Sequence, residues 1–113
     1  MVVDMNVLTI VGQLTKDAEM THNKIFPVLF FTIATNRKRK NQDGSFIAEA
    51  SFFDVNVFGK YAETMIDRLK KGVKVIIVGE LKQERWTDNS GVNKSRVVLI
   101  ANSIQVIGGE NAQ

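Results

Sequence analysis

The sequence predicts an all-β domain, a small barrel of five strands with one helix between the third and fourth strands. Three observations predict it. Runs of β-branched and aromatic residues recur along the chain and are separated by turn residues. Only one stretch, after the third of these runs, shows the apolar spacing of a helix. The chain has 113 residues, of which 44% are hydrophobic, and this suits one compact domain with one core.

The first two strands are expected at residues 7–11 and 28–35. Gly12 follows the first strand and indicates a bulge or a sharp bend. Pro27 precedes the second strand, where a missing N–H donor is tolerated. The tract 36–44 is polar and ends in Asp-Gly, which predicts a long hairpin loop before the third strand.

The third strand, residues 46–58, carries aromatic rings on both faces. Side chains of a strand alternate between two faces. One face is an ordinary core row, Phe53, Val55 and Val57. The other face has polar residues together with two rings, and its members are Phe52, Asp54, Asn56 and Phe58. Phe52 and Phe58 therefore lie on the face where polar residues belong.

One helix is predicted after the third strand, because apolar residues recur at i, i+3, i+4 and i+7. This stripe consists of Ala62, Met65, Ile66 and Leu69. Three cations, Arg68, Lys70 and Lys71, are expected in or just past its last turn, where the helix dipole favours them. Gly72 is the predicted helix stop.

The last two strands are expected at residues 73–86 and 95–106, joined by a hairpin turn at 87–91. The predicted inward row of the fourth strand is Val73, Val75, Ile77 and Leu81. Trp86 has the opposite parity and lies among charged residues. Gly79 could bulge and reset this register, so Trp86 either faces solvent or caps the end of the barrel. Three strands, one helix and two strands form the order of the OB architecture.

Composition excludes several classes of chemistry. Without cysteine, the chain has no disulfide, thiolate metal site or cysteine nucleophile, and its single histidine, His22, cannot form a histidine-rich metal site. We find no glycine-rich phosphate loop and no nucleophilic triad, so neither an enzyme nor a cofactor is expected. No apolar run approaches the roughly 20 residues that span a bilayer, and no secretory signal is visible, which favours a soluble intracellular protein.

The exposed rings point to single-stranded nucleic acid. Every base has a π-face on which an aromatic side chain can stack. The alternative is that a loop or a neighbouring subunit covers Phe52 and Phe58. The net charge of +3 is compatible with a polyanionic partner.

The densest positive charge is the run Arg37, Lys38, Arg39 and Lys40, which we expect to project as a mobile basic loop and to bind phosphates. The alternative is a solvated loop that keeps the protein soluble. Further candidate phosphate-binding residues are Lys60, Lys82, Arg85, Lys94 and Arg96.

The chain resembles the bacterial-type single-stranded DNA-binding proteins (SSB) over nearly all of its length. The matching segments, whose order and spacing together are specific, are 6–8, 11–14, 17–19, 33–35, 57–63, 69–72, 78–81 and 85–91. The resemblance implies an OB-fold domain, residues 1–107, followed by a flexible remnant, residues 108–113. It also implies a homotetramer in which the first strand contributes to subunit pairing, and a cytoplasmic, nucleoid-associated role in replication, recombination and repair.

In this family, rings at four positions stack on bases, and three positions match here: Phe52, Phe58 and Trp86. The fourth falls at about Lys38 or Arg39 and is not aromatic, which favours phosphate or cation–π contacts there. Phe46 shares the parity of Phe52 and is a candidate replacement.

The printed sequence ends at Gln113 without the acidic tail typical of bacterial members, so replication and repair proteins are expected as partners only if the native chain carries such a tail. Two other function classes remain as alternatives. One is a primosomal-type accessory protein that acts mainly through protein contacts. The other, an enzyme or small-ligand barrel, lacks a convergent polar site. RNA binding stays open, because stacking accepts either sugar.

Overall fold

A computed structural model describes residues 1–21 and 26–109 of the chain, and it confirms an OB-type barrel with one short helix. The elements are β1 (Leu8–Leu14), β2 (Glu19–Met20), β3 (Val28–Lys40), β4 (Phe46–Phe58), α1 (Lys60–Met65), β5 (Lys74–Thr87) and β6 (Asn93–Gly108). Their order in the sheet is β1-β5-β6-β4-β3-β2, and a further pairing of β1 with β3 closes the five-stranded barrel. The two-residue strand β2 is an addition to the predicted five. His22 and the last four residues lie outside the described part of the chain.

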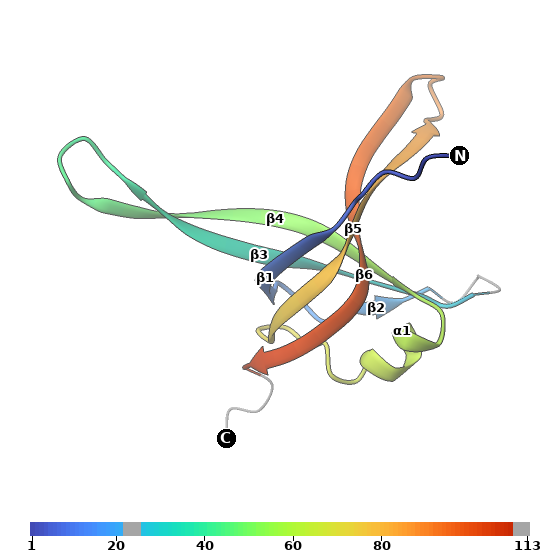
Figure 1. The fold of residues 1–113 in the computed structure, drawn as a ribbon, viewed down its shortest axis with the longest axis horizontal. Helices are drawn as coiled ribbons and strands as arrows, with labels where there is room; N and C mark the ends of the chain where they lie inside the picture. Colours follow the sequence, from blue (N-terminus) through green and yellow to red (C-terminus); the bar gives the residue numbers. More distant parts are fainter. Residues whose placement is uncertain (22–25, 110–113) are drawn as a thin grey trace.

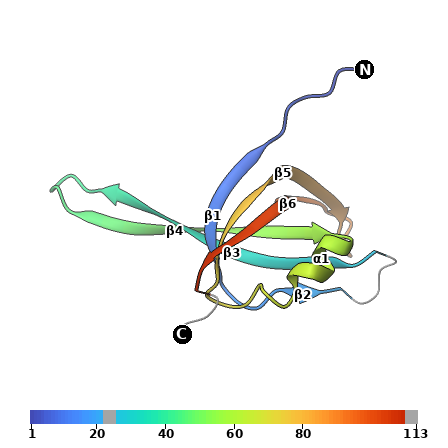
Figure 2. The ribbon, with the colours of Figure 1, turned by 60° about the horizontal axis from the view of Figure 1, so that its bottom comes forward.

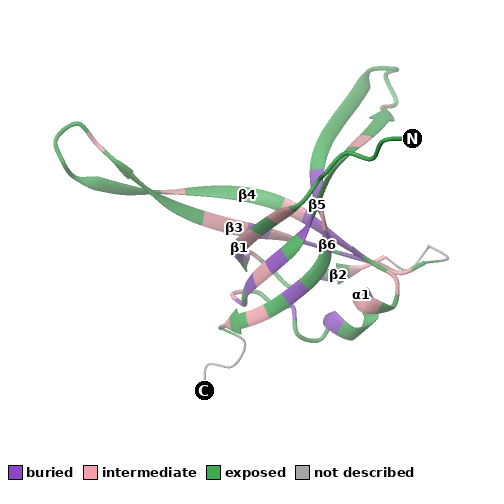
Figure 3. Ribbon diagram, viewed as in Figure 1, coloured by how far each residue is buried: buried purple, intermediate pink, exposed green. Residues whose placement is uncertain are grey.

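The core lies inside the barrel and is built from one face of each of the five barrel strands (Figure 3). Fully buried members include Leu29, Ile33, Val55, Val57, Val75 and Ile77. The helix α1 closes one end of the barrel, beside β2 and away from the β3–β4 hairpin tip (Figure 2). The Tyr61 hydroxyl anchors α1 by accepting a hydrogen bond from the backbone N–H of Ile104 (2.7 Å).

Two long hairpins leave the barrel in different directions (Figure 1). The strands β4 and β6 pair only at Val55↔Leu99 and Asn56↔Ile100, so beyond this point each hairpin is an independent two-stranded arm. The β3–β4 arm is paired as far as Lys40↔Phe46, and the β5–β6 arm as far as Thr87↔Asn93. Both arms expose most of their residues, and they carry most of the candidate site residues (Figure 3).

The hairpin loop predicted for 36–44 is wrong in extent. Residues 36–40 continue β3, and only residues 41–45 form the turn, where the Asn41 N–H donates to the Ser45 carbonyl (2.7 Å). The basic run is thus the end of a paired strand and not a mobile loop. Both faces of a two-stranded arm meet solvent, so such a strand needs no apolar row that would reveal it in sequence.

The predicted helix is also too long. It ends at Met65, and Leu69 is buried from the following turn segment, with Gly72 (φ +88°) leading into β5. The backbone of this segment binds the β1–β2 connection, because the Ala18 N–H donates to the Leu69 carbonyl (2.9 Å) and the Lys71 N–H donates to Asp17 (2.8 Å). These bonds replace the helical ones that the apolar spacing predicts.

Three predicted placements are wrong, two of them in the core rows. Phe53 and Leu81 are exposed, because at these points β4 and β5 have left the barrel for the arms. Asn56, predicted on the polar face, is buried, and its amide donates to Glu84 of β5 (3.4 Å).

Two glycines show why the strands can close into a barrel. At Gly79 the β5–β6 register shifts, as its position in the sequence suggests, and a Cβ there would overlap the carbonyl of Ile100. The first strand continues through Gly12 to Leu14 without a bulge. A Cβ at Gly12 would lie 2.9 Å from Ile33, so the glycine allows β1 to cross closely over β3.

Candidate nucleic-acid interface

Four phenylalanine rings lie exposed on one face of the β3–β4 sheet, which we call the aromatic face. Antiparallel partners point to the same side, and the register therefore places Phe46, Phe52 and Phe58 of β4 with Phe30 of β3. Their exposed fractions are 58%, 64%, 44% and 39%, respectively. At about 3.4 Å per residue, Phe46, Phe52 and Phe58 follow one another at intervals of roughly 20 Å along β4.

Phe30 was missed in the sequence reasoning, although the sequence contains the signal. Leu29, Phe31 and Ile33 are the buried row of β3. Phe30 has the opposite parity, and it lies across from Asn56 on the outer side of the barrel. The same alternation test that singles out Phe52 in β4 therefore finds Phe30 in β3.

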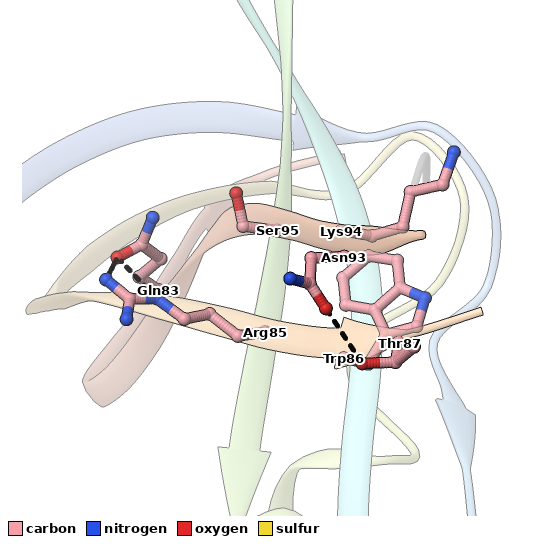
Figure 4. A pocket seen from close by; sticks show the side chains of 7 residues that line it. All are labelled: Gln83, Arg85, Trp86, Thr87, Asn93, Lys94 and Ser95. Carbon is pink, nitrogen blue, oxygen red and sulfur yellow. Dashed lines mark hydrogen bonds between the residues drawn. The ribbon is translucent and has the colours of Figure 1, made fainter. Parts of the chain in front are cut away.

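Trp86 projects from the end of the β5–β6 arm and does not cap the barrel. It pairs across the arm with Lys94, and the indole lies in one cluster with Lys94 and Thr87 (Figure 4). The Thr87 hydroxyl donates to Asn93 Oδ1 (3.0 Å), which holds the last pair of the arm together. The hollow at this end has a volume of about 560 Å³, and 46% of Trp86 is exposed. The ring is thus open to a partner.

A charge network lines a groove of about 470 Å³ that Phe30 also lines. The guanidinium of Arg96 donates from Nε to Glu84 (3.0 Å) and lies 3.5 Å from Asp54. Asp54 in turn accepts a hydrogen bond from the Thr32 hydroxyl (2.8 Å). Two carboxylates therefore surround Arg96, and this part of the groove is not a site of excess positive charge.

The remaining candidate cations divide between the faces of the two arms. Lys82 lies on the same face of the arm as Trp86, and so does Lys94, which pairs with Trp86 across the strands. Arg85 lies on the opposite face and donates a hydrogen bond to Gln83 Oε1 (2.8 Å). Lys94 also lies 3.8 Å from Asp88. Lys60 is exposed at the start of α1, two positions after Phe58.

Within residues 1–21 and 26–109, no group of three histidine, cysteine or acidic side chains is placed to hold a metal ion. In the same part of the chain, none of the helices has the length and apolar character needed to cross a membrane.

The chain matches the sequence model of the single-strand binding protein family over residues 5–107. The chain belongs to this family. Relatives named single-stranded DNA-binding protein include one from Wolinella succinogenes (43% identical, covering 95% of this chain and 67% of the relative) and one from Aquifex aeolicus (41% identical, covering 91% and 70%).

A solved member of the family supports the fold. The crystal structure of a deletion mutant of the single-stranded DNA-binding protein from Thermus aquaticus aligns with a TM-score of 0.80 at 24% identity, covering 93% of this chain and 51% of that one. This chain therefore spans about two thirds of the length of the two relatives and about half of the length of the solved protein.

Proposed function

We propose that this chain binds single-stranded DNA without marked sequence preference and protects it during replication, recombination and repair. The observation that carries this proposal is the row of exposed rings on the aromatic face, with Trp86 on the second arm. Base stacking accepts every base, and each stacked base contributes roughly 1–3 kcal/mol by alanine substitution. A duplex keeps its base faces inside the stack, so these rings favour the unpaired strand.

Lysines and arginines around the rings supply the second part of the affinity. Each phosphate that a cation neutralises releases condensed counterions, so binding weakens as salt rises. Two carboxylates surround Arg96, which leaves this task to the other cations on the arms. The proposed activity is binding, and it involves no bond-making step.

We further propose that the chain assembles as a homotetramer. Within the described residues, Leu8–Gly12 of β1 pair on one side only, with β5, and an unpaired strand edge is a template for another chain. An apolar groove of about 510 Å³ adjoins this strand and is lined by Leu8, Thr9, Ile10, Phe53, Leu81, Val97 and Leu99. Assembly would bury this surface and allow one strand to cross several subunits, which increases the effective affinity.

The test uses Trp86, the only tryptophan, as the reporter. Titration with an oligo-dT strand should quench its fluorescence strongly, more weakly at high salt, whereas a duplex of the same length should have little effect. No response to either nucleic acid, together with no binding in a labelled-oligonucleotide assay, would refute the proposal and favour an accessory protein that uses these rings for protein contacts.

A further inference from the structure

The β3–β4 arm has two chemically different faces. Pairs opposite each other in the antiparallel register share a face. One face carries the pairs Lys40↔Phe46, Lys38↔Ala48 and Asn36↔Ala50 and continues to Phe52 at the base of the arm. The other carries Arg39↔Ile47, Arg37↔Glu49 and Thr35↔Ser51. The four consecutive cations 37–40 are therefore divided two and two.

The first face combines rings, small residues and lysines. Phe46 and Phe52 are both mostly exposed, and between them β4 presents Ala48 and Ala50, which are also exposed and leave room above the strand. The ammonium of Lys38 lies 5.3 Å from the centre of the Phe46 ring, a cation–π distance. A lysine stem is flexible, so this ammonium can leave the ring when a base stacks there and still reach a neighbouring phosphate.

The second face carries an acidic side chain between its cations. Glu49 lies 3.1 Å from the guanidinium of Arg39 and 4.0 Å from that of Arg37. Such exposed ion pairs add little to folding stability. Their effect on a ligand is different, because a phosphate that approaches Arg37 or Arg39 also meets the carboxylate of Glu49. Between the base of the arm and its turn, this face has Ile47 but no aromatic ring.

We propose that single-stranded DNA runs along only one face of this arm, with bases on Phe46 and Phe52 and phosphates at Lys38 and Lys40. Glu49 offsets one of the two positive charges of Arg37 and Arg39, so this face carries a net charge of +1, whereas Lys38 and Lys40 give the other face +2. The inference deepens the proposed function and rests on it, since it states which face of the arm the strand uses.

The test compares two matched double variants that each remove two positive charges from neighbouring positions of the same strand. These are Lys38→Gln with Lys40→Gln, and Arg37→Gln with Arg39→Gln. Affinity for a fluorescein-labelled oligo-dT is measured by anisotropy over a salt series. Each phosphate contact on a single strand contributes about 0.7 to the slope of log affinity against log salt. The lysine variant should lose about 1.4 of this slope, and the arginine variant should lose no more than about 0.7.

A third variant tests this offset. Glu49→Gln should restore the charge that the carboxylate offsets and steepen the slope by about 0.7. The same substitution made together with Arg37→Gln and Arg39→Gln should leave the slope of that double variant unchanged. Circular dichroism melts serve as the folding control, because all five substituted side chains lie on the solvated arm.

Equal losses of slope in the two double variants would overturn the assignment to one face, as would a larger loss in the arginine variant. Either result leaves single-stranded DNA binding intact. Absence of salt-dependent binding by the unmodified protein would instead refute the proposed function.

Discussion

Phe30 offers a sharp test of the aromatic face, because a matched control exists on the same pair of strands. Phe30 and Phe53 are 39% and 36% exposed, and the register places them on opposite faces of the β3–β4 sheet. Only Phe30 lies with Phe52 and Phe58. Replacing each by leucine therefore removes a ring of similar exposure from either side.

Leucine is preferable to alanine at these positions. With 39% exposed, Phe30 buries on the order of 120 Å² of a side chain of roughly 200 Å². At 25 cal/mol per Å², alanine would sacrifice up to about 3 kcal/mol of folding stability, enough to confuse unfolding with lost binding. Leucine keeps most of this buried surface and removes the flat face on which a base stacks.

We expect Phe30→Leu to weaken oligo-dT binding by about 1 kcal/mol or more, which is a five-fold or greater rise in Kd. The control Phe53→Leu should stay within about two-fold. Anisotropy titrations measure both values, and size-exclusion chromatography checks that the oligomeric state is unchanged. Equal Kd values for the two variants would refute Phe30 as part of the interface.

Three other results are expected. Trp86→Ala should weaken oligo-dT binding by about 1–3 kcal/mol in the anisotropy assay without moving the thermal midpoint, and parental affinity would remove Trp86 from the interface. Gly79→Ala should destabilise the fold by at least about 2 kcal/mol in urea, because its Cβ overlaps the Ile100 carbonyl; an unchanged midpoint would contradict this geometry. Hydrogen bonds from the side chain and backbone of Ser45 lower the pKa of Asp43 below its ordinary 3.8. The carboxylate should therefore stabilise the turn at neutral pH, and this stabilisation should be lost as pH falls through the lowered pKa. Ser45→Ala should raise the pKa of Asp43 in a carbon-13 NMR titration. An unaltered pKa would exclude the hydroxyl as the cause.

Features that depend on local periodicity were predictable from the sequence. The alternation in residues 52–58 places Phe52 and Phe58 outside the barrel and Val55 and Val57 inside, as the structure has them. The order of the strands around a single helical stretch also indicates the barrel, because each run carries its own β signal.

Features at the ends of the elements were not predictable. The basic tract 36–40 lacks an apolar row, since both faces of the arm are solvated, and only its pairing with β4 makes it a strand. The helical spacing of Ala62, Met65 and Leu69 continues beyond Met65, yet hydrogen bonds to the β1–β2 connection end the helix there.

By itself, the sequence determined which side chains alternate in and out, and therefore that rings occur on a polar face. The tertiary structure decided which of these side chains meet. Arg96 lies against Glu84, twelve positions away, and against Asp54, which is on another strand. Glu49 reaches Arg37 and Arg39 across a hairpin. The physical reason is that the charge a ligand encounters depends on neighbours brought together by strand register, and register is set by the hydrophobic pattern of the strands and the geometry of the turns that join them.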